Sequence, residues 1–241
     1  MDQQQLAKME HCRSKLVELT QRLGAVESAF IIDFAEPNER LGKSWLKSFK
    51  SRDSILFSSA KVSYLFERSR SSMTRLDPDL VKASNKDKHV WLEDKNLKQQ
   101  QSKLSIIKEL GFSKQLSVTF PLQNWQGLKG CYSLFYALDC PMTDEQRFAR
   151  MDELMADIKM VGTHIVSERV LTGPFEDYQL FKPSTISIIK HLAEGRSRKD
   201  LSDIHYMSAR GVDYHIEKAK IVLEAQNTSH LVHVAHQMML I

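Results

Sequence analysis

The residues of this chain that are best suited to contact an anion lie in the segment 195–223. Ser197 is a good N-cap for a short helix over residues 198–205, and Ser208 is one for a second helix over residues 209–223. Two helices joined by such a short turn are typical of a helix-turn-helix. The chemistry that this motif serves is the recognition of double-stranded DNA.

The second of these helices has two different sides when its residues are placed at about 100° intervals. The core side is predicted to hold Val212, Ile216, Ala219 and Leu223. The outward side presents Arg210, Tyr214 and Lys218. This is the side that enters the major groove, where arginine suits O6 and N7 of guanine. Polar and cationic side chains at the start of the first helix could hold phosphates, namely Arg196, Ser197, Arg198 and Lys199.

A solvated basic face on a small helical bundle is the alternative to a DNA-binding face. Glu217 lies on the outward side and favours this alternative. Residues 181–241 contain eight Lys and Arg against six Asp and Glu, which is a weak excess of positive charge. Spacing and charge alone therefore leave DNA binding open.

Six of the nine histidines also fall in residues 181–241. They are His191, His205, His215, His230, His233 and His236. No carboxylate or cysteine completes a metal-ligand set around them, so we expect no metal site. Near their ordinary pKa of about 6.5, they would add positive charge in mild acid and so tighten DNA binding.

Several protein classes are disfavoured by the sequence. The chain has no glycine-rich phosphate loop, nucleophile elbow or metal-ligand pair at catalytic spacing, so we expect no enzyme. The three cysteines are odd in number and lack metal-ligand spacing, which is typical of free thiols in a reducing compartment. No apolar run approaches the roughly 20 residues of a membrane span, and no secretory signal is visible. We therefore expect a cytoplasmic protein.

The first two thirds of the chain alternate between helical and strand patterns. Helices are predicted over residues 2–23, 62–74, 97–110 and 143–170, the last with Thr143 and Gln146 as a capping box. Strands are predicted over residues 28–34, 54–59, 115–122 and 130–138, whereas 35–45 and 86–89 read as polar turn and loop. These elements indicate a mixed sheet covered by helices.

The fold class that follows is α+β, with an α/β/α sandwich-like sensor domain followed by an all-α, four-helix helix-turn-helix domain. Gly173-Pro174 breaks the long helix before it, and the next residues show no clean period. We place a sensor or dimerisation domain at 1–170, a linker at 171–182 and the DNA-binding domain at 183–241.

The C-terminal segment resembles the helix-turn-helix of LuxR-type transcription regulators. The matching residues are Leu192-Ala193-Glu194-Gly195, Ser197, Lys199-Asp200-Leu201, Ser208, Arg210, Val212, Tyr214-His215, Leu223, Asn227, Ser229 and Leu240-Ile241. The resemblance adds Ser208 and His215 to the DNA-binding candidates, and it implies a homodimer on a double-stranded operator. The chain departs from the family at Gly211 and Val222, and at Ser184, Thr185 and Ser187 in place of acidic residues.

The N-terminal part resembles, more faintly, the acyl-homoserine-lactone-binding domain of quorum-sensing members of that family. Asp77-Pro78 matches its Asp-Pro, whose carboxylate takes the ligand's amide N–H. Trp91, Ser133 and the helix-closing Gly111 match further positions. The resemblance implies that Tyr64, Arg68, Asp77, Trp91 and Ser133 face a small-molecule ligand, with tyrosine replacing the family's lactone-binding tryptophan and arginine its tyrosine.

Arg68 decides what such a ligand could be, because a buried guanidinium is costly without a partner. It either turns to solvent, pairs with Asp77 or meets a polar group on the ligand. Three outcomes stay open: a different small molecule, no ligand, or a homoserine lactone.

Together these features predict a cytoplasmic, dimeric, DNA-binding transcription regulator of the LuxR quorum-sensing type, without a cofactor and controlled by a small molecule in the N-terminal domain. The alternative is a ligand-independent regulator whose N-terminal domain only dimerises or docks a protein partner.

Overall fold

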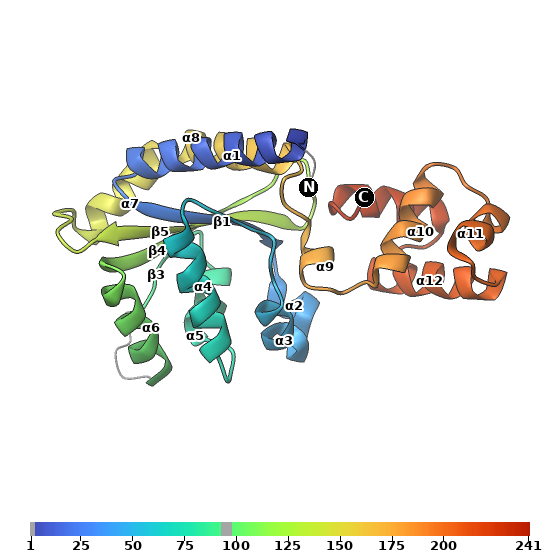
Figure 1. Ribbon diagram of the computed structural model, residues 1–241, viewed down its shortest axis with the longest axis horizontal. Helices are drawn as coiled ribbons and strands as arrows, with labels where there is room; N and C mark the ends of the chain where they lie inside the picture. The colour runs from blue at the N-terminus through green and yellow to red at the C-terminus, as the bar shows by residue number, and fades with distance from the viewer. Residues whose placement is uncertain (1–2, 93–97) are drawn as a thin grey trace. The chain divides into compact units, whose positions relative to one another are not determined.

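The computed structural model describes residues 3–92 and 98–241 (Figure 1). The chain divides into two compact units, one over residues 1–122 and 127–171 and one over residues 172–241 together with 123–126. Among the described residues, no helix is both long enough and apolar enough to cross a membrane.

The first unit is built on a five-stranded sheet in the order β2-β1-β5-β4-β3, as far as the described residues go. The strands are β1 (Glu27–Phe34), β2 (Ile55–Phe57), β3 (Lys88–Val90), β4 (Phe112–Pro121) and β5 (Leu128–Ala137). All four strand pairings are antiparallel. The expectation of a mixed sheet was therefore wrong. β1 runs antiparallel to β2 and β5, and β4 runs antiparallel to β5 and β3. No crossover between parallel strands is therefore present among the described residues.

Helices cover both faces of this sheet, as Figure 1 shows. One face carries α1 (Gln3–Arg22) and α8 (Met155–Ser167), which is preceded by α7 (Asp144–Glu153). The other carries α2 (Pro37–Leu41), α3 (Trp45–Lys50), α4 (Ala60–Ser72), α5 (Pro78–Ser84) and α6 (Lys98–Glu109). The α/β/α layering predicted from the sequence is confirmed.

Strand alternation divides the side chains of the central strands between the two faces. Tyr132 of β5 points toward α8, where its hydroxyl donates to the carbonyl of Ile158 at 3.1 Å. Ser133 and Phe135 are two residues apart, so both point to the opposite face of the sheet. That second face is the one toward α4 and α6.

Two predicted elements differ from the observed ones. The long helix predicted over 143–170 is interrupted at Leu154, which ends α7 and precedes α8, whereas its predicted capping box at Thr143 and Gln146 is present. The predicted loop at 86–89 contains the start of β3, which pairs with β4. Strand pairing over such a distance in sequence leaves no local pattern, so a three-residue edge strand reads as loop.

The polar stretch 35–45 also contains helices. Pro37 opens α2 at the first helical position, where a missing N–H costs nothing. Trp45 opens α3 and is almost wholly buried. The turn residues that precede them masked this helical content in the sequence.

The second unit contains five helices in the part of the chain that the structure describes: α9 (Pro174–Asp177), α10 (Pro183–Ala193), α11 (Arg198–His205), α12 (Ala209–Val222) and α13 (Thr228–Gln237). Four of them correspond to the predicted four-helix domain. Its core holds the predicted inward residues of α12, namely Val212, Ile216, Ala219 and Leu223, with Leu201 and Leu231 from the flanking helices. The stretch predicted as a linker holds α9 and buries Phe175, Tyr178 and Phe181.

Candidate functional site

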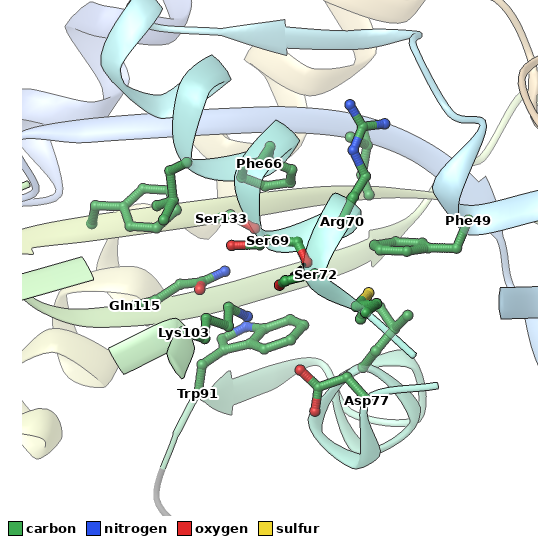
Figure 2. A pocket seen from close by; sticks show the side chains of 15 residues that line it. Phe49, Phe66, Ser69, Arg70, Ser72, Asp77, Trp91, Lys103, Gln115 and Ser133 are labelled. Carbon is green, nitrogen blue, oxygen red and sulfur yellow. Dashed lines mark hydrogen bonds between the residues drawn. The ribbon is translucent and has the colours of Figure 1, made fainter. Parts of the chain in front are cut away.

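The first unit contains a cavity of about 80 Å³ on the face of the sheet that α4, α5 and α6 cover (Figure 2). This volume is several times the roughly 10–15 Å³ that one water needs by the same measure. Phe49, Phe66 and Leu80 contribute apolar walls. Asp77, Lys103, Gln115 and Ser133 contribute polar atoms, and Trp91 contributes its ring. An apolar cavity with a few convergent polar groups is the usual form of a small-molecule site.

Asp77 is positioned by its role at the start of α5. Its Oδ1 accepts a hydrogen bond from the backbone N–H of Asp79 at 2.9 Å, so it caps the helix. Pro78 follows at the first helical position and fixes the backbone there. Asp77 is only 2% exposed, and within the described residues its Oδ2 receives no hydrogen bond. One carboxylate oxygen is therefore left for the cavity.

Trp91 forms a wall of the cavity with its ring rather than offering its N–H. Its Nε1 donates to Ser117 Oγ at 3.1 Å. The ammonium of Lys103, from α6, lies 3.9 Å from the centre of the ring. This is a cation–π contact, which strengthens when the cation is removed from water.

Lys103 is one of two cationic residues in the described lining of the cavity, with Arg70. Burial lowers the pKa of its ammonium to about 8, although the carboxylates of Asp77 and Asp79 act in the opposite direction. Desolvation therefore outweighs the attraction to the nearby negative charges. No ion pair joins Lys103 to a carboxylate in residues 3–92 and 98–241.

Two buried polar atoms of uncharged side chains in the lining have no hydrogen-bond partner among the residues that the structure describes. They are Gln115 Oε1 and Ser69 Oγ. Gln115, from β4, is only 3% exposed. Since an unsatisfied buried polar atom costs free energy, both atoms indicate a place where a polar ligand or ordered water is held.

Tyr64 and Arg68 lie outside this cavity, unlike Asp77, Trp91 and Ser133. Both are on the exposed side of α4, and their side chains contact each other at 3.1 Å between Arg68 Nη1 and Tyr64 OH. Arg68 also forms an ion pair of 3.2 Å with Glu109. Of the arrangements considered for the guanidinium, the structure shows the one that turns to solvent.

Sequence reasoning missed Lys103 and Gln115. A signal for Lys103 was present, because it stands four residues before Ile107 and seven before Leu110, on the inward side of the same helix. Gln115 gave a weaker signal, as a polar residue at the start of a predicted strand. Their proximity to Asp77 depends on strand pairing, which no local pattern gives.

In the second unit, α11 and α12 form the predicted pair of capped helices. Ser197 Oγ accepts from the N–H of Asp200 in a full capping box, and Ser208 Oγ accepts from the N–H of Gly211 at 3.2 Å. The hydrogen bonds from Ser197 hold the pKa of the Asp200 carboxyl below its usual range. Tyr206 takes a left-handed backbone conformation with a φ of 50° and ends α11.

The outward side of α12 is exposed as predicted from the helical spacing. Arg210 and Tyr214 are exposed, and Lys218 is partly so. On the preceding helix and its N-terminus, Arg196, Ser197, Arg198 and Lys199 are all exposed. Ser208 is also exposed, at the start of α12.

Besides the capping serines Ser197 and Ser208, two further DNA-binding candidates have partners within the unit. Arg198 Nε donates to Asp213 Oδ1 at 2.8 Å. His215 is buried, and its Nδ1 lies 2.7 Å from Thr185 Oγ1 of α10. His215 therefore packs against the neighbouring helix rather than joining the exposed side of α12.

A second histidine contact lies nearby, between His191 Nδ1 and His205 Nε2 at 3.2 Å. Burial, and then the charge of His191, lowers the pKa of His205. Burial also lowers the pKa of His215, with smaller effects from the charges of Lys182, Lys218 and His205. Within the described ranges, no group of three or more His, Cys, Asp or Glu is arranged to hold a metal ion.

No protein-family model matches this chain. No curated protein sequence matches it either. Among solved structures, it is similar to a crystal structure of Escherichia coli SdiA, at 16% identity and a TM-score of 0.48, covering 100% of this chain and 92% of that one. It is also similar to SdiA in complex with octanoyl-rac-glycerol, at 17% identity and a TM-score of 0.47, covering 99% and 89%.

Proposed function

We propose that this chain is a DNA-binding transcription regulator of the LuxR type, which acts as a homodimer in the cytoplasm and is controlled by a small molecule in its first unit. The observation that carries the DNA-binding part is the exposed side of α12, with Arg210 at its N-terminal end and Tyr214 one turn further on. The N-terminal part of such a helix is the part that reaches base edges in the major groove.

The cations around this helix divide into those that are free to contact DNA and those that are engaged. Arg196, Lys199, Arg210 and Lys218 form no ion pair within the part of the chain that the structure describes. Lys220 pairs with Glu217 at 2.9 Å. This ion pair offsets the negative charge of Glu217, the residue that favoured a solvated face over a DNA-binding face.

The cavity in the first unit supports the sensor part of the proposal. Its apolar walls surround a carboxylate oxygen, an ammonium and two buried atoms that lack partners. A ligand that prefers the DNA-competent conformation would shift the population toward it by its difference in affinity. The ligand contacts proposed from the described geometry are Asp77, Trp91, Ser133, Lys103 and Gln115.

The experiment that tests DNA binding begins with selection of duplexes from a random pool by the purified full-length protein. The fluorescence anisotropy of the selected duplex then measures affinity for each variant. Arg210→Ala is expected to weaken binding by about 1–3 kcal/mol and to relax the preference at one base pair. Lys199→Ala should weaken binding to all duplexes evenly and flatten the salt dependence.

Lys159→Ala is the charge-matched control, because Lys159 is an exposed residue of α8 in the first unit. It removes the same charge and should leave affinity unchanged. Selection that enriches no sequence, or an Arg210→Ala variant that binds as the wild type does, would refute the assignment of α12.

A further inference from the structure

We infer that the ligand of the cavity is a small amphipathic carboxylate, whose head group pairs with the ammonium of Lys103 while its chain lies against the aromatic wall. This inference rests on the proposed sensor function and names the chemical class of the signal. The cavity holds an ammonium that has no counterion in direct contact among the described residues.

Lys103 has no counterion in direct contact among the described residues. An ammonium carries three donors, and this one contacts the face of the Trp91 ring but forms no hydrogen bond or ion pair with the described residues. A partly buried cation without a counterion is unfavourable, and an anion placed beside it offsets the cost. Figure 2 shows the Lys103 side chain against Trp91, with Gln115 close by.

The nearby carboxylates are already occupied by other donors. Asp77 caps α5 through Oδ1. Asp79 accepts from the N–H of Leu92 at 2.8 Å, and its Oδ1 lies 3.6 Å from His89 Nε2. These contacts explain why neither carboxylate closes on Lys103 as an ion pair.

The charge around the cavity can accommodate one further anion. Arg70 from α4 and Lys103 from α6 are the cations in the lining, and Asp77 is the carboxylate. Asp79 lies outside the lining, where its Oδ1 is 3.6 Å from His89 Nε2, although its charge also acts on Lys103. Since Arg70 donates to the carbonyl of Arg52, Lys103 is the cation that a ligand carboxylate would meet.

The atoms without partners indicate what else the head group carries. Gln115 Oε1 and the second oxygen of Asp77 are both acceptors, so they suit an O–H or N–H on the ligand. A 2-hydroxy carboxylate supplies both features, an anion for Lys103 and a donor for one of these oxygens. Phe49, Phe66 and Leu80 would then contact its chain.

The test is calorimetric titration of the full-length protein with 2-hydroxyoctanoate and, separately, with its neutral amide. The carboxylate is expected to bind about tenfold more tightly than the amide or better, which is about 1.4 kcal/mol. Lys103→Met should abolish this preference. Lys108→Met, an exposed lysine on the same helix, should retain it and serves as the matched control.

The pH dependence provides a second measurement on the wild type. Because only the ammonium pairs with the carboxylate, and its pKa is about 8, affinity for 2-hydroxyoctanoate should fall about tenfold from pH 7 to pH 9. Affinity for the amide should stay constant. Lys103→Arg should remove the fall, since arginine stays charged throughout.

Equal affinity for the two probes, no binding of either, or a preference that survives in Lys103→Met would overturn the inference. If Lys103→Met does not fold, the wild-type pair of probes and the Lys103→Arg titration still decide it. Neither readout involves DNA, so the failure of this inference is distinguishable from a failure of the DNA-binding proposal.

Discussion

The histidine contacts of the second unit have a consequence for stability. His205 contacts His191, and His215 contacts Thr185, so both are held in packed surroundings between helices. The pKa of each is lowered below its ordinary value, chiefly by burial. The folded state therefore binds fewer protons than the unfolded state in mild acid.

The sign of the resulting pH dependence follows from this difference in proton binding. Stability rises with pH wherever the unfolded state binds more protons. The stabilisation is present above the ordinary histidine pKa of about 6.5 and is lost as the pH falls through it. We expect the melting temperature to decline between pH 7.5 and pH 5, and to decline less in His205→Gln.

Melts of both proteins across this pH range check the prediction. His233→Gln, at an exposed position of α13, is the control and should decline as the wild type does. If the melting temperature declined equally in His205→Gln and the wild type, His205 would not contribute to the pH dependence of stability. This effect opposes the tighter DNA binding that the sequence predicted for histidines in mild acid, because His205 and His215 resist protonation.

Which site residues could be predicted depended on whether their position is set by local sequence or by tertiary packing. Asp77 was identified by its match to the family's Asp-Pro, and the structure adds that it caps α5, a helix that was not predicted from the sequence. Tyr64 and Arg68 were placed by matching positions, but helix rotation directs them to solvent, where Arg68 meets Glu109. That rotation is set by packing of the helix against the sheet, which a short sequence window does not contain.

Among the helices, α8 shows how packing against the sheet constrains the sequence. Gly162 faces β4 and β5, and a Cβ at this position would lie 2.4 Å from Phe120 Cζ and 3.1 Å from the Tyr132 hydroxyl. Both rings are buried and cannot move aside easily. The close approach of helix and sheet therefore requires glycine here, despite its cost to the helix.

Gly162→Ala is expected to destabilise the protein by about 1–3 kcal/mol through overpacking. The gain in helix propensity, up to about 1 kcal/mol, offsets only part of this loss. Urea denaturation with circular dichroism measures the difference. Met160→Ala, on the exposed side of the same helix, should change the free energy of unfolding by less than about 0.5 kcal/mol. A Gly162→Ala variant as stable as the wild type would show that the sheet and helix can separate without cost.

Elements defined by local signals were predicted well, and elements defined by pairing were not. The capping residues Thr143, Ser197 and Ser208 all begin helices in the structure. By contrast, β3 and the antiparallel pairing of β1 with β5 depend on partners far along the chain. Register between such partners is specified by the packed face of the sheet, so it emerges only with the tertiary structure.

For the complete chain, the proposed function requires two copies of α12 to reach DNA together. A dimer of helix-turn-helix units reads two half-sites about one helical turn apart, or a multiple of it. Four of the cationic DNA-binding candidates of each chain form no ion pair among the described residues: Arg196, Lys199, Arg210 and Lys218. A dimer would therefore offer eight, and their phosphate contacts determine the salt dependence.

Two measurements on the selected duplex follow from this geometry. If all these cations met phosphates, the slope of log K against log salt would be about −7, and contacts of Arg210 with bases make it shallower. Inserting five base pairs between the half-sites turns one of them by about half a helical turn and should abolish cooperative binding. Inserting ten base pairs adds about one full helical turn, so both half-sites lie on the same side of the DNA again. This insertion is the matched control. Binding that is unaffected by the five-base-pair insertion would show that each chain binds alone, and a slope near zero would show that phosphates are not contacted at all.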